Sequence, residues 1–358
     1  RAAQSSAEML GQHVEKFIDK TEDLQRLAKN VEGALVETTR TCRLLANCIR
    51  RGVAFHHAGL HHEQRKVVEN GFRENLIKVI CATPTLAAGV NLPARRVVIR
   101  DYRRYVEPLG SVPIPVLEFH QFCGRAGRPQ YDEYGEALLI ARSEKEVEFL
   151  FDEFISAPPE KIISKLATEP ALRTHVLSSV AAEYVNDIES LSKFMEKTFF
   201  AHQFGTGRVE QVVERVLDFL EREELIHRKG NLLIATPFGE KVSGLYIDPL
   251  SAVLIRNGLL NIAGEKPTTL GLLHLVSATP DMPTLYLRER EYEQKEEEFI
   301  KHVGEFLTPV PDPSFEPEKF ERLLAELKTA FMLKAWIEEK REEKIHEEFG
   351  VGAGDVRR

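Results

Sequence analysis

One apolar run that breaks into a polar turn decides the fold of this chain: Val79-Ile80-Cys81-Ala82-Thr83-Pro84-Thr85-Leu86-Ala87-Ala88-Gly89-Val90-Asn91-Leu92-Pro93-Ala94. Its first residues have the uninterrupted apolar character that is typical of a buried parallel strand. The Thr-Pro-Thr turn is predicted to lead into a short helix of small residues and a Gly-x-Asn loop. Ligands of open α/β sheets bind at the carboxyl ends of strands, so this loop is expected to border a site. The Thr83 and Thr85 hydroxyls and the free N–H groups of a helix start suit a phosphate.

A second stretch lies downstream and reads Gln121-Phe122-Cys123-Gly124-Arg125-Ala126-Gly127-Arg128-Pro129. It follows a predicted helix and sets two arginines three residues apart between glycines. Each arginine offers a planar fork of donors and a permanent charge, which suits the terminal phosphates of a nucleotide. The alternative is a plain helix end with surface arginines.

The residues around these two stretches alternate between strand and helix patterns. Further strands are predicted at 53–55, 96–100 and 136–141, and helices at 63–72 and 116–123. Such alternation is typical of a parallel sheet. Between the strands, residues 102–115 contain Gly110, Pro108 and Pro113 among aromatic and β-branched residues, which predicts an excursion or hairpin.

The middle of the chain has a different pattern. Three helices are predicted over 171–184, 188–199 and 208–223, followed by two short apolar strands on either side of a Gly230-Asn231 turn. Three helices and a hairpin describe a winged helix. Such modules bind DNA or act as rigid spacers, and the glutamates of 208–223 favour the spacer, since base readout needs positive or amide side chains.

The last hundred residues are predicted to be helical. The expected helices cover 251–262, 269–278, 288–307, 317–340 and 342–349, with prolines at the breaks. The fold class is therefore α/β followed by an all-α region.

Composition narrows the class of protein. The net charge of −8 alone argues against nucleic acid, but residues 281–348 hold 19 acidic and 11 basic side chains, while residues 51–165 hold 15 and 16. The second region contains a basic cluster that suits a phosphate backbone: Arg95, Arg96, Arg100, Arg103 and Arg104. The alternative is that these arginines are solvated or paired with Asp101 and Glu107.

Other composition signals exclude several classes. The four cysteines are scattered without a Cys-x-x-Cys pair, which is typical of free thiols in a reducing cytoplasm. No apolar run reaches the roughly 18 residues of a membrane span, and the first residues do not have the pattern of a secretory signal. Four clustered histidines lack carboxylate or cysteine partners at ligand spacing, so no metal site is predicted there: His56, His57, His61 and His62.

Three strings together resemble the motifs of superfamily-2 helicases. They are His56-His57-Ala58-Gly59-Leu60, the run from Ala82 to Arg96, and Gly124-Arg125-Ala126-Gly127-Arg128-Pro129. The residues of these strings are similar to the motifs of the Ski-like branch and, within it, to those of the archaeal HELQ-type DNA repair helicases. The resemblance covers nearly the whole chain.

This resemblance implies three domains. Residues 1–170 would form the second RecA-like helicase domain, incomplete at its N-terminus and with a hairpin insertion. Residues 171–250 would form the winged helix, and residues 251–358 the start of a truncated helical ratchet domain. The chain contains no Gly-x-x-x-x-Gly-Lys-Ser/Thr loop and no Asp-Glu-x-His motif. In the family these lie in a preceding RecA-like domain, so the chain alone is expected not to hydrolyse ATP.

The resemblance also implies a nucleotide site. Arg128 would be the arginine finger, with Arg125 and Gln121 as further contacts to ATP. ATP and Mg²⁺ would be held mainly by the first RecA-like domain. Gly89 and Asn91 would lie beside the nucleotide, although many relatives place an aspartate at the second position.

For DNA, the resemblance implies contacts to phosphates rather than to bases. Thr83 with Thr85, Arg65, and the basic pair Arg95 and Arg96 would hold the strand, and Arg358 would be a contact from the ratchet domain. The hairpin would separate strands through a tip that stacks on the terminal base pair, formed by Tyr105, Val106 and Leu109. The alternative is an ordinary connecting loop.

The resulting hypothesis is the C-terminal part of an ATP-dependent helicase that moves 3′ to 5′ on single-stranded DNA and unwinds forked duplexes in repair or replication restart. Single-stranded and forked DNA, the first RecA-like domain and replication or repair proteins are the expected partners, and the expected location is the cytoplasm, on the nucleoid. Two alternatives stay open. One is an RNA helicase of the same branch, because 2′-hydroxyl contacts cannot be read from the sequence. The other is a non-catalytic single-strand-binding fragment.

Overall fold

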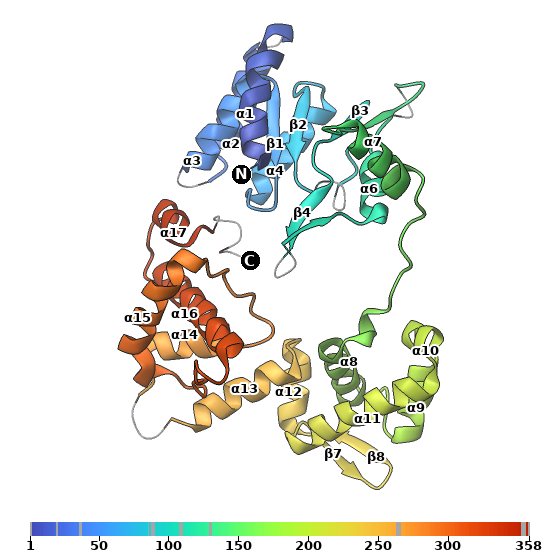
Figure 1. Ribbon diagram of the computed structural model, residues 1–358, viewed down its shortest axis with the longest axis vertical. Coiled ribbons are helices and arrows are strands. Elements are labelled where there is room, and N and C mark those ends of the chain that lie inside the picture. Colours follow the sequence, from blue (N-terminus) through green and yellow to red (C-terminus); the bar gives the residue numbers. More distant parts are fainter. Residues whose placement is uncertain are drawn as a thin grey trace. The chain divides into compact units, whose positions relative to one another are not determined.

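The computed structural model describes residues 2–18, 21–35, 38–84, 86, 90–106, 110–128, 131–262, 266–351 and 356. The chain divides into two compact units, Arg1–Lys161 with Gly350–Arg358, and Ile162–Phe349. Figure 1 shows the elements of both. In the part of the chain that the structure describes, no helix is both long and apolar enough to cross a membrane.

The first unit is built on two parallel strand pairs. One pairs β1 (Val53–His56) with β2 (Val79–Ala82), and the other pairs β3 (Arg96–Ile99) with β6 (Glu136–Leu139). Among the described residues no ladder joins the two pairs. The parallel pairing confirms the sequence prediction, and it places the carboxyl ends of β1 and β2 at one edge.

Helices cover these strands in the first unit. They are α1 (Ala2–Val14), the short η1 (Glu15–Phe17), α2 (Thr21–Glu32), α3 (Arg40–Arg50), α4 (His62–Arg73), α6 (Val116–Cys123) and α7 (Glu144–Leu150), which continues as the π-helical η2 (Phe151–Ile155). All four residues of β1 are buried; α1, α3 and α4 pack against it, and α2 packs on α3 and α4. A smaller core forms around Phe119 of α6 and Phe154.

Helix α6 matters because the arginine stretch follows it directly. The first two backbone amides of this helix hydrogen-bond to a residue far away in the sequence. The carboxylate of Glu160 accepts from Val116 N at 2.5 Å and from Leu117 N at 3.0 Å. These hydrogen bonds lower the pKa of Glu160. A carboxylate at a helix N-terminus complements both the free donors and the helix dipole, so the start of α6 is fixed.

The second unit begins with the predicted winged helix. After the short η3 (Lys165–Ala167), its elements are α8 (Glu169–Ala181), α9 (Ile188–Glu196), α10 (Phe199–Phe204), α11 (Thr206–Arg222) and the antiparallel pair β7 (Ile226–Lys229) and β8 (Leu232–Ala235), followed by α12 (Pro237–Leu245). Gly230 supplies the positive φ of +62° that the hairpin turn requires. These elements enclose the largest core of buried side chains described, with Leu172 and Leu220 fully buried.

Two details of the winged-helix region differ from the sequence prediction, and farther along the single helix expected over 288–307 is divided into η4 (Glu289–Glu291), α15 (Tyr292–His302) and η5 (Val303–Glu305). The single helix expected over 188–199 ends at Glu196, because the Thr198 hydroxyl accepts from Ala201 N at 3.2 Å and caps a new helix, α10. Helix α12 was not predicted, although Thr236 followed by Pro237 is a start signal: the Thr236 hydroxyl accepts from Gly239 N at 3.0 Å.

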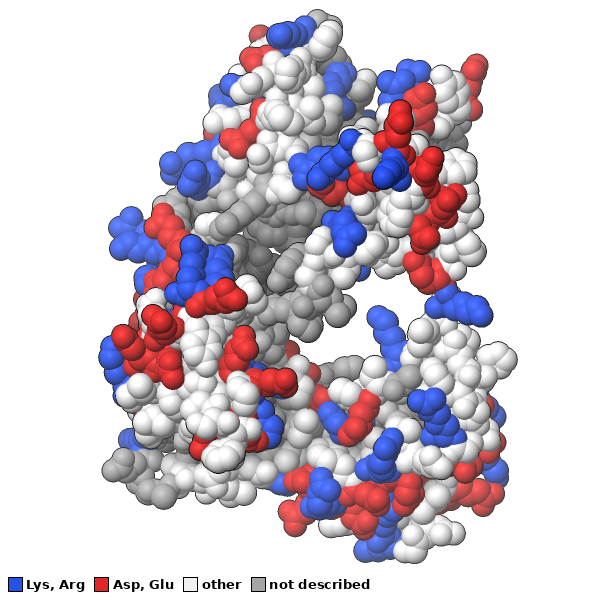
Figure 2. All heavy atoms as spheres, viewed as in Figure 1, with Lys and Arg blue, Asp and Glu red and all other residues white. Residues whose placement is uncertain are grey.

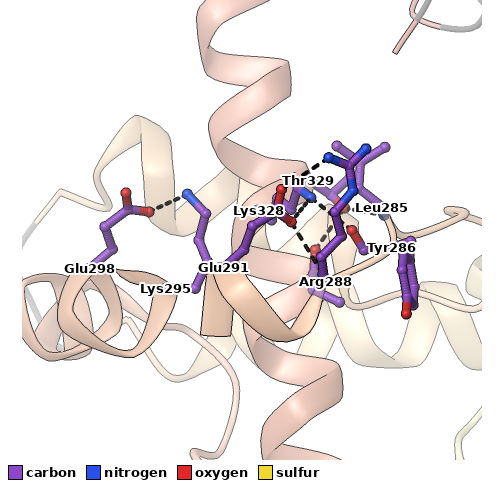
Figure 3. A network of polar contacts seen from close by, with 9 residues as sticks. Leu285, Tyr286, Arg288, Glu291, Lys295, Glu298, Lys328 and Thr329 are labelled. Carbon is purple, nitrogen blue, oxygen red and sulfur yellow. Dashed lines mark hydrogen bonds and ion pairs between the residues drawn. The ribbon is translucent and has the colours of Figure 1, made fainter. Parts of the chain in front are cut away.

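The C-terminal helices form a bundle with charged groups inside. They are α13 (Pro249–Leu260), α14 (Thr269–Ser277), η4 (Glu289–Glu291), α15 (Tyr292–His302), η5 (Val303–Glu305), α16 (Pro317–Ile337) and α17 (Glu342–Phe349). Buried Lys328 of α16 donates to Tyr286 O at 2.7 Å and to Glu291 at 2.6 Å, and its neighbour Thr329 accepts from Leu285 N at 2.8 Å (Figure 3). A segment without regular structure is thereby fastened to α16.

A buried ion pair ties the winged helix to the first helix after it. Arg173 of α8 donates to both carboxylate oxygens of Asp248, at 3.2 and 3.0 Å. The two side chains are only 7% and 6% exposed. Asp248 also caps α13 by accepting from Leu250 N at 2.9 Å. The carboxylate of Asp248 therefore binds Arg173 of α8 and also caps the N-terminus of α13.

We expect Arg173→Met to lower the free energy of unfolding by about 3–5 kcal/mol, because it leaves a buried carboxylate without its cation. Denaturant unfolding of the chain, followed by circular dichroism, measures this. The matched control is Lys193→Met, which removes an exposed pair with Glu189 and should cost less than about 1 kcal/mol. Equal effects of the two changes would contradict the interpretation.

Candidate functional site

A short backbone bridge brings the two predicted motif stretches together. Ala94 N donates to Arg125 O at 2.9 Å, and Gly127 N donates to Ala94 O at 2.7 Å. The bridge pairs Ala94 with Ala126 in the parallel sense. The residues after the Gly-x-Asn loop therefore lie directly beside the two arginines that follow α6.

Two glycines close the loop that contains Arg128. Gly127 has a φ of +91°, which disfavours other residues. A Cβ at Gly135 would lie 2.3 Å from Gly127 N and 2.4 Å from Ala126 C, so no side chain fits there. The two ends of the segment from Gly127 to Gly135 are in contact, which holds Asp132 next to Arg128.

The closest partner of Arg128 is Asp132. Arg128 Nε donates to Asp132 Oδ2 at 2.8 Å and Nη2 donates to Oδ1 at 2.9 Å, while Arg128 N donates to Oδ2 at 3.1 Å. The guanidinium also lies 5.6 Å from the ring centre of Tyr131. The Arg128 side chain is 37% exposed and that of Asp132 only 8%. The carboxylate therefore holds one edge of a guanidinium that still reaches solvent.

This pairing shifts the titration of both groups in the expected directions. The hydrogen bond from Arg128 lowers the pKa of Asp132, with smaller contributions from the backbone of Arg128 and from the charge of Arg95. The same bond raises the pKa of Arg128. Both groups are therefore charged over the whole physiological pH range.

The other predicted nucleotide contacts lie around the same bridge. Arg125 Nη1 donates to Asn91 Oδ1 at 3.4 Å, and the Arg125 side chain is half-buried. Gln121 is exposed on the last turn of α6. Gly89 lies outside the described residues. The structure thus brings Asn91 to Arg125 and leaves both predicted arginines partly exposed.

Two of the predicted DNA contacts, Thr83 and Arg65, lie close to His56 at the carboxyl end of β1. Thr83 N donates to His56 O at 3.1 Å, which fixes the turn after β2 beside the end of β1. Arg65 of α4 lies near enough to His56 for its charge to help lower the pKa of that histidine, although burial is the main cause. The buried Nε of Arg65 has no hydrogen-bond partner among the described residues. Thr85 and Arg358 lie outside the described residues.

Most arginines of the predicted basic cluster have partners in their own domain. Arg96 pairs with Glu136, Arg100 donates to Asp101 at 2.7 Å, and Arg104 donates to Glu118 at 2.7 Å. Arg103 donates to Ser111 O at 2.5 Å. Figure 2 shows basic and acidic side chains interspersed on the face viewed. Pairing therefore accounts for much of this cluster, and Arg95 is an exposed member whose charge acts on Asp132.

The predicted hairpin is present as β4 (Arg103–Val106) and β5 (Gly110–Pro113), which pair antiparallel. Gly110 has a φ of +74° at the start of β5. Tyr105 and Val106 lie at the end of β4, opposite Ser111 and Gly110. Their side chains, and Leu109, lie outside the described part of the chain, so their role in strand separation stays a prediction.

Sequence reasoning missed the carboxylates that hold this site. Asp132 and Glu136 each bind an arginine that was predicted to be functional, and Glu160 binds the start of the helix that precedes Arg125 and Arg128. The spacing of four residues between Arg128 and Asp132 was an available signal. The sequence around Glu160 contains no such signal, because Glu160 lies over forty residues from its partners in the sequence.

In the described residues, no group of three or more histidine, cysteine, aspartate or glutamate side chains is placed to hold a metal ion. The donors around the bridge are guanidinium and amide groups instead. Their chemistry fits the oxygen atoms of phosphates, for which arginine forks are suited.

Three family models match successive parts of the chain. "Helicase conserved C-terminal domain" matches residues 19–130, "Helix-turn-helix domain" matches 135–227, and "Archaeal helicase, domain 4" matches 270–358. Their order agrees with the predicted RecA-like, winged-helix and helical regions. The predicted boundaries at residues 170 and 250 stay predictions.

Several curated proteins named "ATP-dependent DNA helicase Hel308" are similar to this chain. The protein of Methanocella arvoryzae is 48% identical over 361 residues, which cover 100% of the chain and 48% of that protein. The protein of Pyrococcus abyssi is 38% identical, with 100% and 49% covered. The protein of Pyrobaculum calidifontis is 42% identical, with 88% and 43% covered. The chain spans about half the length of these relatives.

We expect the carboxyl group of Asp132 to titrate below its ordinary pKa of 3.8, because Arg128 stabilises the carboxylate. A lowered pKa means that the pair stabilises the loop above the ordinary pKa and that this stabilisation is lost as the pH falls through the lower value. Carboxyl carbon NMR over an acid titration measures it.

Arg128→Ala is the matched variant for this titration, since it should raise the pKa of Asp132 towards 3.8. Lys145→Ala is the control and should leave it unchanged, because Lys145 is exposed on α7 and makes no described contact to Asp132. If the pKa of Asp132 were the same in Arg128→Ala as in the unmodified chain, the ion pair would not exist in solution.

Proposed function

Because this chain is a Hel308-like archaeal superfamily-2 helicase sequence, we propose that it supplies the second RecA-like domain, the winged helix and the following helical domain of an ATP-dependent DNA helicase. The observation that carries the proposal is the bridge at Ala94 and Ala126, which sets Asn91, Arg125 and Arg128 around one backbone junction. The relatives' names state ATP dependence and DNA as substrate, and the site offers donors suited to phosphate.

In this proposal the two arginines act on a nucleotide that another RecA-like domain holds. Asp132 engages the Nε and Nη2 edge of Arg128. A guanidinium has five N–H donors, so the opposite edge keeps donors for phosphate oxygens. Asp132 is then a positioning residue that need not release Arg128. Arg125 and Gln121 provide further contacts, and Asn91 orients Arg125.

ATP and Mg²⁺ are the proposed cofactors. The described residues offer no group suited to hold a metal ion, so Mg²⁺ would be held by the other RecA-like domain. When bound there, it neutralises charge on the terminal phosphates. The residues of this chain would add positive charge from the opposite side as the terminal phosphoryl group leaves.

The DNA strand would lie along the edge formed by the ends of β1 and β2. Thr83 N donates to His56 O there, and the charge of Arg65 lies near the same histidine. Contacts to phosphates grip the strand without reading its sequence, as a motor requires. We further propose movement 3′ to 5′ and unwinding of forked DNA, with the hairpin of β4 and β5 at the fork.

We expect Arg128→Ala to lower DNA-stimulated ATP hydrolysis by about 10³-fold or more while single-stranded DNA affinity persists, because the guanidinium stabilises charge only in the transition state. The assay needs a protein that also contains the nucleotide-binding RecA-like domain. Arg142→Ala is the control, since its side chain is 82% exposed on the same unit. Unchanged turnover in Arg128→Ala would end the assignment.

A second expectation concerns DNA and can be measured on this chain alone. Arg65→Ala should weaken single-stranded DNA binding equally for all sequences and reduce the slope of log affinity against log salt by about 0.7, the value for one phosphate contact. Fluorescence anisotropy over a salt series measures it. Arg26→Ala, which removes an exposed arginine paired with Asp23, is the control. An unchanged slope in Arg65→Ala would remove Arg65 from the DNA path.

A further inference from the structure

A groove opens on the winged-helix region between α9, α10 and α11. It encloses a cavity of about 260 Å³. Apolar side chains from α9 and α11 form its floor: Leu191, Met195, Val209, Val213 and Leu217. All five are buried in the core of this region, so the floor is rigid.

Carboxylates border this apolar floor. Glu196, Glu210 and Glu214 line the cavity, and no lysine or arginine lines it. Glu214 also accepts from Arg228 at 2.7 Å, whereas Glu210 is exposed and has no ion-pair partner among the described residues. The groove therefore combines an apolar interior with a negatively charged border.

The basic residues of α11 point elsewhere. Helix α11 presents Val209, Glu210 and Val213 to the cavity. At 100° per residue, Arg208 and Arg215 lie on the opposite side of the helix, and Arg208 lies 5.2 Å from the ring of Phe204. Charge is thus segregated around one helix, and the groove side is negative.

This combination selects among possible occupants. Phosphates would be repelled by the carboxylates, so a nucleic acid does not fit the groove. The volume lies below the roughly 300–1,000 Å³ of typical small-molecule sites. It matches a few apolar side chains projecting from one face of a helix, as in helix-in-groove recognition.

We propose that the groove between α9 and α11 binds an amphipathic helix of a separate partner protein. The helix would place two or three large apolar side chains, spaced three or four residues apart, on the floor. Lysines or arginines beside these anchors would face Glu196, Glu210 and Glu214. The apolar contacts provide affinity, and the charges select basic helices over acidic ones. This site uses none of the residues assigned to ATP or DNA.

Two synthetic peptides test the proposal on the full 358-residue chain. Both carry the same leucine anchors at helical spacing, and their flanking positions are all lysine in one and all glutamate in the other. By fluorescence anisotropy, we expect the lysine peptide to bind with a Kd below about 100 μM and the glutamate peptide at least about tenfold more weakly. Equal affinities, or no binding of the lysine peptide below about 1 mM, would overturn the proposal.

Variants locate the binding in the groove. Ser192→Trp places a large ring at the cavity edge, at a half-buried position, and should weaken the lysine peptide at least about tenfold. Glu210→Lys should weaken the lysine peptide and strengthen the glutamate peptide.

Arg215→Glu is the control on the opposite side of α11 and should change the affinity of the lysine peptide by less than about twofold. Circular dichroism melts establish that each variant is folded. The proposal would be overturned if either variant, Ser192→Trp or Glu210→Lys, were folded and bound the lysine peptide with the affinity of the unmodified chain.

Discussion

The backbone bridge between Ala94 and Ala126 is the constraint on which the candidate site depends. Two hydrogen bonds there join a loop that follows one strand to a turn that follows a helix. The anchoring of α6 by Glu160 and the contact between Gly127 and Gly135 both fix the turn side of this junction. Backbone geometry therefore determines where Arg125 and Arg128 lie, and their side-chain contacts make a secondary contribution.

Ion pairs reduce the positive charge that the cluster of arginines in the sequence predicts for a DNA-binding surface. Of the five arginines clustered along the sequence, three pair with carboxylates: Arg96 with Glu136, Arg104 with Glu118, and Arg100 with the adjacent Asp101. Arg65 of α4 stands apart, because its side chain forms no ion pair with a carboxylate among the described residues. Affinity for a phosphate chain would then come from a few well-placed donors, and the overall charge of −8 does not oppose it.

Local signals predicted much of the fold. The strand expected over 77–82, which the structure forms over Val79–Ala82, and the helix over Val116–Cys123 were predicted because apolar patterns and Pro or Gly boundaries were strong there. The break at Thr198 was missed because a capping hydroxyl overrode a continuous helical pattern. For the site, motif spacing predicted both arginines, and their role stays a prediction. Asp132 and Glu160 were missed because their partners are set by loop closure and tertiary packing, which a sequence pattern does not encode.

The contact between Gly127 and Gly135 has a consequence for how this segment tolerates change. Since no atom can be added at Gly135, the loop has a fixed closure point, and its length sets where Asp132 stands relative to Arg128. An insertion or deletion between Arg128 and Asp132 would move the carboxylate away while the arginine itself is retained. In this part of the chain, the spacing is therefore constrained as well as the identities of Asp132 and of the two glycines.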